Sequence, residues 1–309
     1  MPISIALLGC AHPHVRDYLA VIAAEPDLAL AAAWDGDSSA VPGPIAGFAV
    51  RDVETAIARA DAVVVCAPTD ERPVLCARAA RAGRPILVEK PVARTAAEAR
   101  RLAREIDRGR TPAAAALFLR ELPALGQLRG VLRAGILGRI AGIRARYAHG
   151  GALNGMLDGP SGWMRDPRRA GVGGFGDLAL HLVDALAALG RLPRIDAVSL
   201  DRAAGGGDLG GSAVGRWDRI PVTLTASWAA AEAGLWLTVD GARATANLHD
   251  GVLEISDGGA GERWIGSPPH AGEALRAFAA RLRARTLRQD GLAPAIAAQE
   301  ILERTALTE

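Results

Sequence analysis

Residues 85–91 read Pro85-Ile86-Leu87-Val88-Glu89-Lys90-Pro91, a short apolar run that ends in a glutamate, a lysine and a proline. Lys90 is the only lysine in the chain of 309 residues, because the other 35 of its 36 basic side chains are arginines. A lysine ammonium is compact and its pKa shifts readily on burial, whereas a guanidinium is bulky and permanently charged. Open α/β sheets bind ligands at the carboxyl ends of their strands, so this position favours a functional lysine over chance survival on the surface.

Strands and helices are predicted to alternate on either side of this stretch. Apolar runs of strand length recur between segments that carry helix caps, such as Asp52 and the capping box formed by Thr95 and Glu98. The expected strands cover residues 3–8, 28–34, 61–68, 86–88 and 113–118, and the expected helices cover 13–24, 52–60, 69–82 and 95–108. This alternation predicts a parallel, doubly wound sheet in a first domain, residues 1–118.

The second domain, residues 119–309, is predicted to be α/β with an open, largely antiparallel sheet. Short strands separated by Gly and Asp turns are expected at 143–147, 197–200, 222–228, 235–239, 244–248 and 252–255. Helices are expected near 121–133, 177–189, 272–287 and 294–306, and residues 203–215 are expected to form a glycine-rich surface loop.

The composition narrows the class of protein. A net charge of +2 with 23% charged residues is too balanced for a surface that binds nucleic acid or a membrane. No apolar run reaches the roughly 18 residues of a spanning helix. Three cysteines without CxxC spacing fit a reduced compartment, so the expected location is the cytoplasm.

The first strand, the turn at Gly9 and the following helix have the layout of a dinucleotide-binding Rossmann unit. A helix N-terminus offers free N–H groups to a pyrophosphate, and an acid about 20 residues further on binds ribose hydroxyls. Asp35, 21 residues after His14, is that acid, and its charge favours NAD over NADP. The glycine fingerprint has Ala11 and His14 where glycines are expected, so a domain that has lost its cofactor is the alternative.

The histidines of this turn raise the question of a metal site. His12 and His14 are two residues apart, and residues at that spacing do not share a helix face. The sequence shows no adjacent cluster of Cys, His and acids, so no metal is expected. His12 is instead placed near the cofactor phosphates or given a structural role.

A second group of polar residues follows the glycine-rich stretch 171–176. Asp177 and His181 are four residues apart and share a helix face, with Asp184 on the same side. Imidazole is the usual group for moving protons near neutral pH, and a neighbouring carboxylate can hold it in place. The alternative is an ordinary Asp–His pair on a surface helix, and Asp184 is expected to be an arginine partner or a structural hydrogen-bonding residue.

Together these stretches resemble the glucose–fructose oxidoreductase / inositol dehydrogenase / rhizopine catabolism (Gfo/Idh/MocA) family. Four segments carry the resemblance: the strand and turn at 3–9, the stretch 63–91 ending in Glu89-Lys90-Pro91, Gly135-Ile136-Leu137-Gly138-Arg139-Ile140, and Gly173-Gly174 through Asp177, His181 and Asp184.

The resemblance implies a nicotinamide cofactor, NAD with NADP possible, and a sugar, polyol or related substrate. It implies a homodimer or homotetramer formed through the C-terminal sheet, and a cis peptide before Pro91. The family's catalytic set falls on Lys90, Asp177 and His181. The expected cofactor-binding residues are Gly9, Ala11, His12, His14, Asp35, Pro68, Thr69, Glu89 and Lys90. The chain departs from the family pattern at Ala11 and His14, and at Arg72, which stands near the family's usual histidine.

The predicted reaction is hydride transfer between nicotinamide and a hydroxyl or carbonyl group. In this hypothesis His181 takes the hydroxyl proton, Asp177 orients His181, and Lys90 stabilises the developing alkoxide. The alternatives are a non-catalytic NAD(P)- or sugar-binding regulator on the same scaffold, and an enzyme that recycles its cofactor without releasing it. Further candidates for substrate contact are Trp163, Arg165, Tyr147, His149 and His270.

Overall fold

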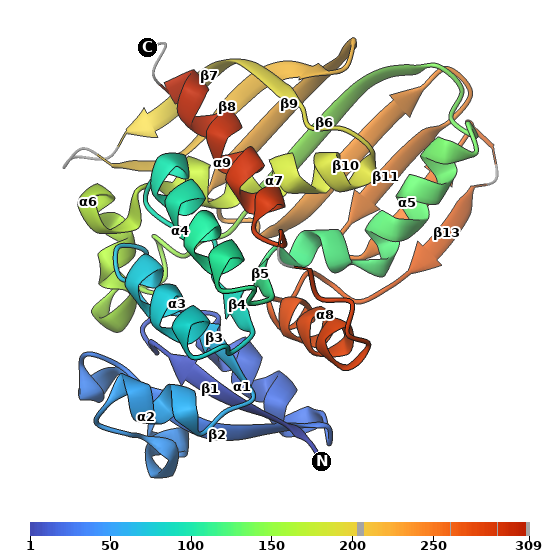
Figure 1. Cartoon of the computed structure of the whole chain (residues 1–309). Coiled ribbons are helices and arrows are strands. Elements are labelled where there is room, and N and C mark those ends of the chain that lie inside the picture. The colour runs from blue at the N-terminus through green and yellow to red at the C-terminus, as the bar shows by residue number, and fades with distance from the viewer. Residues whose placement is uncertain (203–206, 260, 289, 307–309) are drawn as a thin grey trace. The chain divides into compact units, whose positions relative to one another are not determined.

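The computed structural model describes residues 1–202, 207–259, 261–288 and 290–306, shown in Figure 1. The chain divides into two compact units, each assembled from separate segments. Unit 1 comprises Met1–Ala116, Leu157–Gly171 and Ala271–Ile296, and unit 2 comprises Leu117–Met156, Val172–His270 and Ala297–Glu309. The predicted boundary at residue 118 lies two residues after the first segment of unit 1 ends.

Unit 1 is built on a parallel sheet whose strands, in the described part of the chain, follow the order β2-β1-β3-β4-β5. The strands are β1 (Ile3–Leu8), β2 (Leu28–Trp34), β3 (Ala62–Val65), β4 (Ile86–Val88) and β5 (Ala113–Ala115). Most of their side chains are buried, as the continuous apolar runs predict for a sheet covered on its two faces.

The helices of unit 1 largely follow the predicted positions. They are α1 (Val15–Ala24), η1 (Ser38–Ala40), η2 (Gly43–Phe48), α2 (Val53–Ala58), α3 (Arg72–Arg81), α4 (Ala96–Arg108), η4 (Gly159–Arg165), α6 (Pro167–Ala170) and α8 (Gly272–Arg283). The predicted caps are confirmed, since Asp52 accepts the Thr55 N–H and Thr95 accepts the Glu98 N–H.

Unit 2 contains a sheet whose described strands follow the order β13-β12-β11-β10-β6-β9-β8-β7. The strands are β6 (Ile140–Ala148), β7 (Arg194–Arg202), β8 (Asp208–Trp217), β9 (Ile220–Ser227), β10 (Gly234–Gly241), β11 (Thr245–His249), β12 (Val252–Ser256) and β13 (Glu262–Ile265). Its described pairings are antiparallel except that of β6 with β9, which confirms the predicted largely antiparallel sheet. Its helices are η3 (Phe118–Glu121), α5 (Pro123–Arg133) and α7 (Gly174–Leu189); α9 (Ala293–Ala306) begins in unit 1 and ends in unit 2.

The surface loop predicted for residues 203–215 is wrong for its second half. Residues 203–206 lie outside the described residues, but Asp208–Trp217 form β8 between β7 and β9. The glycines that suggested a loop allow neighbouring backbone to come close: a Cβ on Gly215 would lie 2.1 Å from the Arg194 carbonyl oxygen, and one on Gly210 would lie 2.6 Å from that of Ala226. Glycine inside a strand often marks such an approach.

Helix α7 is the apolar centre of unit 2. The stretch Pro167–Leu189 has the length and composition of a membrane-spanning segment, but 72% of its most apolar window is buried inside the protein. In Figure 1, α5 and α7 lie on one face of the sheet, and α7 contacts β6, β8 and β9. The apolar character of α7 is therefore explained by its place in a protein core.

A strand residue caps the start of α7. The helix has no side-chain cap from its own N-cap residue, Gly173, and Asp208 of β8 instead accepts the Phe175 N–H at 2.6 Å. A Cβ on Gly173 would lie 2.1 Å from Asp208 Oδ2, and one on Gly174 would lie 2.3 Å from the Leu209 carbonyl oxygen. The two glycines therefore let β8 reach the exposed N–H groups of the helix.

Arg72, the first residue of α3, joins the ends of two neighbouring strands of unit 1. Its guanidinium is fully buried; Nε donates to the Ala67 carbonyl at 2.8 Å, and Nη1 donates to the carbonyls of Pro91 at 2.5 Å and Glu89 at 3.3 Å. These carbonyls belong to the segments that follow β3 and β4. Arginine has the several donors in a fixed arrangement that such a junction requires.

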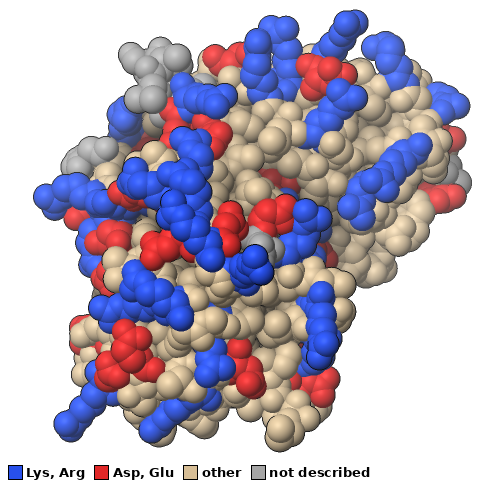
Figure 2. All heavy atoms as spheres, in the orientation of Figure 1, with Lys and Arg blue, Asp and Glu red and all other residues tan. Residues whose placement is uncertain are grey.

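Many charged side chains on the surface pair with a neighbour of opposite charge. Figure 2 shows arginines lying among carboxylates on the face drawn. Arg94 pairs with Glu98 at 2.7 Å and Arg81 with Glu105 at 3.0 Å, both at exposed positions. Such pairs contribute about 0–1 kcal/mol each, so stability rests on the buried groups.

Replacing Asp208 should destabilise the protein through α7. We expect Asp208→Ala to lower the free energy of unfolding by about 1–2 kcal/mol, because the helix loses its cap. Asp208→Asn, which keeps an acceptor, should recover part of that loss. Urea unfolding followed by circular dichroism measures both. Asp201→Ala, at an exposed position of β7, is the matched control, and an Asp208→Ala protein as stable as this control would contradict the role.

Replacing Arg72 should have a larger effect. We expect Arg72→Leu to lower the free energy of unfolding by about 3–5 kcal/mol, because it strands buried carbonyls that the guanidinium satisfies. The control is Arg81→Leu on the same helix, where the side chain is 69% exposed and the change should stay within about 0.5 kcal/mol. Equal urea midpoints for the two variants would refute the proposed junction.

Candidate functional site

Gly9 begins the turn that follows β1, and the backbone around it requires glycine. Its φ of +88° lies in the left-handed region, and a Cβ would lie 2.3 Å from the Cα and backbone nitrogen of Ala67. The segment after β3 therefore crosses directly over this turn. Only glycine satisfies the two conditions together, so the first position of the fingerprint is preserved for a structural reason.

The two altered positions of the fingerprint each have a partner in unit 1. The Ala11 carbonyl accepts the Ser161 hydroxyl at 3.0 Å, and His14 Nδ1 lies 2.8 Å from Glu89 Oε1. The segment containing Ser161 thus packs on the turn, and the His14 ring turns toward the carboxylate after β4. The expected cofactor contacts of Ala11 and His14 remain predictions.

Asp35 links the end of β2 to the turn after β1. Its Oδ2 accepts the Cys10 N–H at 2.6 Å and its Oδ1 accepts the Asp37 N–H at 2.9 Å, which leaves each oxygen a further lone pair for a ribose hydroxyl. Burial, together with the Asp35 charge, raises the pKa of the Cys10 thiol to about 12. Cys10 therefore stays protonated and is no nucleophile.

A cavity of about 510 Å³ opens beside these residues within unit 1. It is lined by Ala11, Asp35, Gly36, Asp37, Ser39, Ala40, Pro68, Glu71, Gly159, Pro160, Trp163 and Arg169. Asp35 and the turn after β1 lie in its wall, at the carboxyl edge of the parallel sheet where dinucleotides bind. This position is compatible with the predicted role of Asp35 as the ribose ligand, and α1 starts next to the turn; the contact itself remains a prediction.

Arg169 fastens the segment Leu157–Gly171 to the edge of this cavity. Its Nε lies 3.1 Å from Asp70 Oδ2 and its Nη2 lies 2.7 Å from Glu71 Oε1, while its carbonyl accepts the Asp70 N–H. The segment lies far from the cavity's other residues in sequence. Sequence reasoning missed Arg169 and Glu71, and the arginine-rich run 165–169 was the one available signal.

Lys90 lies in the core of unit 1, directly after β4. The residue is 2% exposed, and the Lys90–Pro91 peptide is cis, as predicted. Its backbone N–H donates to Glu89 Oε2 at 3.1 Å. The Glu89 carboxylate thus holds the backbone of the residue that carries the chain's one lysine side chain.

Glu89 is a fully buried carboxylate at the centre of a hydrogen-bond network. Its Oε1 accepts the Tyr18 hydroxyl at 2.5 Å and lies 2.8 Å from His14 Nδ1. Burial acts to raise the pKa of the Glu89 carboxyl, but its charged and hydrogen-bonded neighbours, among them His14 and Lys90, hold that pKa well below its usual range. Burial, and then Glu89, raise the pKa of Tyr18 well above its usual value, so Tyr18 remains a donor.

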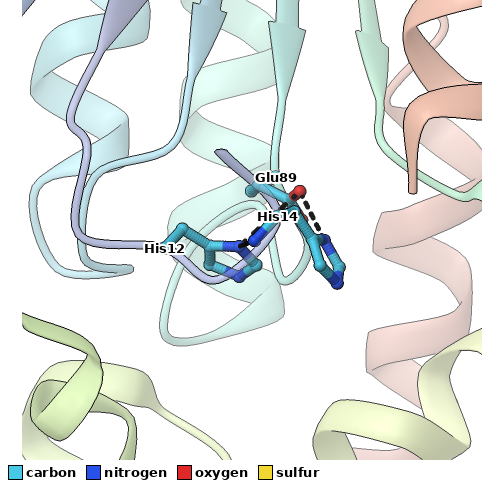
Figure 3. A group of neighbouring side chains, drawn as sticks. All are labelled: His12, His14 and Glu89. Carbon is cyan, nitrogen blue, oxygen red and sulfur yellow. Dashed lines mark hydrogen bonds and ion pairs between the residues drawn. The ribbon is translucent and has the colours of Figure 1, made fainter. Parts of the chain in front are cut away.

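His12, His14 and Glu89 bring three possible metal ligands within 4.8 Å of one another, as Figure 3 shows. The atoms that face one another, Glu89 Oε1 and the Nδ1 atoms of the two histidines, already take part in hydrogen bonds. Glu89 Oε1 accepts from Tyr18 and bonds the His14 ring, and His12 Nδ1 accepts the His14 backbone N–H at 3.2 Å. The geometry is that of a hydrogen-bonded network.

In unit 2, α7 buries the predicted acid–base pair. Asp177 and His181 are 4% and 1% exposed, which rules out the alternative of a surface pair. Asp177 Oδ2 accepts the indole N–H of Trp228, another buried residue, at 3.0 Å. The His181 ring packs against Phe118, with ring centres 4.5 Å apart, and meets Tyr147 edge to face at 5.9 Å. The orientation of His181 by Asp177 remains a prediction.

Asp184 has the structural role predicted for it. Arg120 of η3 makes a bidentate pair with this buried carboxylate, with Nε 2.9 Å from Oδ2 and Nη2 bonded to Oδ1. Arg120 follows Phe118 by two residues, so the pair also fixes the element that supports the His181 ring. Sequence reasoning missed Arg120, Phe118 and Trp228, because no local pattern joins them to α7.

The residues expected to contact substrate are divided between the units. Trp163 lines the cavity of unit 1, and Arg165 pairs with Asp158 at 3.4 Å on the surface. In unit 2, Tyr147 lies beside His181, whereas His149 Nδ1 accepts the Gly151 N–H and supports a turn. His270 ends a segment of unit 2. Tyr147 and Trp163 thus lie at the two candidate sites, and their substrate contacts remain predictions.

Comparison with known families matches the two halves of the chain separately. Residues 3–111 match the family described as "Oxidoreductase family, NAD-binding Rossmann fold", and residues 125–247 match the "GFO/IDH/MocA C-terminal domain". Between them the two matches cover most of the chain, in the order that the resemblance of the sequence implied.

Two characterised relatives align with part of the chain. Levoglucosan dehydrogenase of Pseudarthrobacter phenanthrenivorans is 28% identical over 122 residues, 40% of this chain and 31% of that protein. The rhizopine catabolism protein MocA of Rhizobium meliloti is 34% identical over 132 residues, 41% of this chain and 40% of that protein. The aligned region thus spans well under two thirds of either relative.

Solved structures show the fold over the whole chain. An oxidoreductase from Agrobacterium radiobacter, crystallised with NAD+, L-tartaric acid and magnesium, has a TM-score of 0.82 at 16% identity and covers 100% of this chain and 96% of its own. KijD10, a 3-ketoreductase from Actinomadura kijaniata in complex with NADP and TDP-benzene, has a TM-score of 0.82 at 20% identity and covers 99% and 98%. With its N-terminal Rossmann sheet, its buried Glu-Lys-Pro turn and its two family matches, the chain belongs to the GFO/IDH/MocA oxidoreductase family.

Proposed function

We propose that this protein is a dehydrogenase or reductase that acts on a CH–OH group, or the corresponding carbonyl, of a sugar, polyol or related small molecule. The observation that carries the proposal is the buried Lys90, the single lysine of the chain, placed at the carboxyl end of a Rossmann strand. The relatives named as a levoglucosan dehydrogenase and a 3-ketoreductase support this class of substrate.

The proposed reaction assigns one task to each side chain. When bound, NAD supplies the nicotinamide that accepts or donates the hydride. His181 takes the hydroxyl proton, and the Lys90 ammonium stabilises the negative charge that develops on the substrate oxygen. A fixed cation in a buried site stabilises such charge far better than water does. Trp228 holds Asp177, which in this proposal orients the His181 ring.

Burial of the acid–base pair argues against the regulatory alternative. A ligand-binding regulator has no need to bury an imidazole and a carboxylate on one helix, where desolvation disfavours their charged forms. Catalysis of proton transfer, in contrast, requires groups held in a fixed geometry. An enzyme that recycles a bound cofactor keeps the same residues, so only turnover measurements separate it from a dehydrogenase.

Replacing Lys90 tests the reaction. We expect Lys90→Met to lower kcat by about 10²–10³-fold, the usual effect of losing one group that stabilises an oxyanion. The Kd for NAD, measured by calorimetry, should change by less than about threefold. Turnover is followed as reduced nicotinamide formed with a panel of sugars and polyols.

The control for this variant is Lys90→Arg, which keeps the charge but not the compact ammonium and should also lose most turnover. Undiminished turnover by Lys90→Met would refute the assignment. If the wild-type protein binds NAD but forms no reduced nicotinamide beyond one equivalent per chain with any substrate, the regulatory or cofactor-recycling alternative replaces the proposal.

The cavity of unit 1 favours NAD over NADP. Its wall carries Asp35, Asp37 and Glu71, and its one lining arginine, Arg169, is already paired with Asp70 and Glu71. A 2′-phosphate would therefore meet carboxylates without a free cation from the described lining. We expect NAD to bind at least about tenfold more tightly than NADP, and Asp35→Ser to narrow the difference. Thermal shift titrations with the two cofactors measure this, and stabilisation by NADP alone would overturn it.

A further inference from the structure

Several buried side-chain donor atoms of unit 1 have no hydrogen-bond partner among the described residues, and three of them belong to the residues around the turn after β1 and the cavity. These three are His12 Nε2, Thr69 Oγ1 and Trp163 Nε1, and their residues are 4%, 0% and 7% exposed. A buried donor without an acceptor destabilises the fold, so folded proteins rarely keep several of them in one region. Their grouping indicates a ligand that supplies acceptors.

The protonation state of His12 follows from its contacts. Nδ1 accepts the His14 backbone N–H at 3.2 Å and lies 3.8 Å from Glu89 Oε1, which is too long for a hydrogen bond. Burial holds the pKa of His12 well below its ordinary value, although Glu89 acts in the opposite direction, so the ring is neutral. A neutral imidazole with an accepting Nδ1 carries its proton on Nε2, so that nitrogen is a donor.

The same assignment argues against an ion at this cluster. A metal ligand needs a free lone pair, but the Nδ1 lone pair of His12 is used by the His14 N–H and Nε2 holds the proton. Figure 3 shows the His12 and His14 rings beside the Glu89 carboxylate, whose Oε1 lies 2.8 Å from His14 Nδ1 and 3.8 Å from His12 Nδ1. His12 Nε2, on the opposite edge of its ring, takes no part in this network.

His12 and Thr69 lie where this sheet reverses its strand order. His12 follows β1 and Thr69 follows β3, and these two strands pair in parallel. From β1 the sheet continues to β2 on one side and to β3 on the other, and dinucleotides bind in the crevice at such a reversal. The residues just before them, Ala11 and Pro68, line the cavity that Trp163 also lines, and the Trp163 ring centre lies 6.1 Å from that of His12.

We propose that His12 Nε2–H and the Thr69 hydroxyl are the side-chain donors to the pyrophosphate of the bound dinucleotide. They replace, from the side chains, part of the contact that the second and third glycines of the fingerprint normally provide through backbone approach. The proposal rests on the NAD-binding role of unit 1 and does not depend on the identity of the substrate or on hydride transfer.

Two substitutions of His12 separate its two edges. The amide oxygen of Asn can accept a hydrogen bond as Nδ1 does, but Asn is too short to place a donor at the position of Nε2. The longer Gln side chain can place its amide N–H near that position. Hydrogen bonds to charged groups are among the stronger ones, so we expect His12→Asn to raise the Kd for NAD and for ADP-ribose about tenfold or more. We expect His12→Gln to stay within about threefold of wild type. Calorimetry measures each Kd.

Three probes identify the part of the cofactor that is bound. ADP-ribose keeps the pyrophosphate and lacks nicotinamide, and adenosine lacks both. His12→Asn should weaken NAD and ADP-ribose equally and leave adenosine unchanged. Thr69→Val should show the same pattern, while Thr111→Val, at another buried threonine whose hydroxyl already donates to the Ala80 carbonyl, should bind all three probes as wild type does.

A ¹⁵N spectrum of the histidine side chains tests the donor directly in the wild-type protein. We expect a protonated Nε2 and an unprotonated Nδ1 for His12 without cofactor, and a shift of the Nε2 proton when ADP-ribose is added. An unprotonated Nε2, wild-type binding of ADP-ribose by His12→Asn, or a loss confined to NAD would each overturn the proposal. Absence of turnover in a protein that keeps this binding pattern would instead refute only the proposed reaction.

Discussion

The buried carboxylate of Glu89 is the group on which the candidate site of unit 1 depends. A charged oxygen pair in a protein interior must be fully hydrogen-bonded, and here Tyr18 of α1, the His14 ring and the Lys90 backbone N–H supply the partners. Because these groups come from the first helix, the turn before it and the end of β4, one side chain sets the relative positions of the cofactor turn and the lysine. Loss of the carboxylate would disturb both at once.

Arg72 is a second buried charged group of unit 1, and it stabilises the turn after β4 in a different way from Glu89. Its guanidinium donates to backbone carbonyls on the segments after β3 and β4, including those of Glu89 and Pro91. The Glu-Lys-Pro turn is therefore held through the side chain of Glu89 and, separately, through backbone carbonyls that bind Arg72. Arg72, which stands near the family's usual histidine, therefore has a structural role in this chain. The Lys90 side chain is thus supported by neighbours that have no part in the proposed chemistry, which is the arrangement that preorganised sites need.

In unit 2 the three polar residues of one helix, α7, are each held by a different partner. On α7, Asp177 is bonded by Trp228, His181 is packed between aromatic rings, and Asp184 is neutralised by Arg120. The start of that helix is capped by Asp208, from a strand that follows it in the chain. The spacing of the three polar residues is a local property of the helix, while each of their partners comes from a different element.

Local patterns in the sequence were enough to predict the parallel sheet, the largely antiparallel sheet, the helix caps at Asp52 and Thr95, and the position of the Glu-Lys-Pro turn at the end of a strand, because periodicity and capping act over a few residues. Tertiary structure alone decided the partners of the buried groups: Tyr18 for Glu89, Arg120 for Asp184, Trp228 for Asp177 and Asp208 for the start of α7. It also turned part of a predicted loop into β8, since those glycines serve close strand approach. Such choices depend on contacts between residues far apart in the chain, and no local pattern encodes which distant donor will meet which buried acceptor.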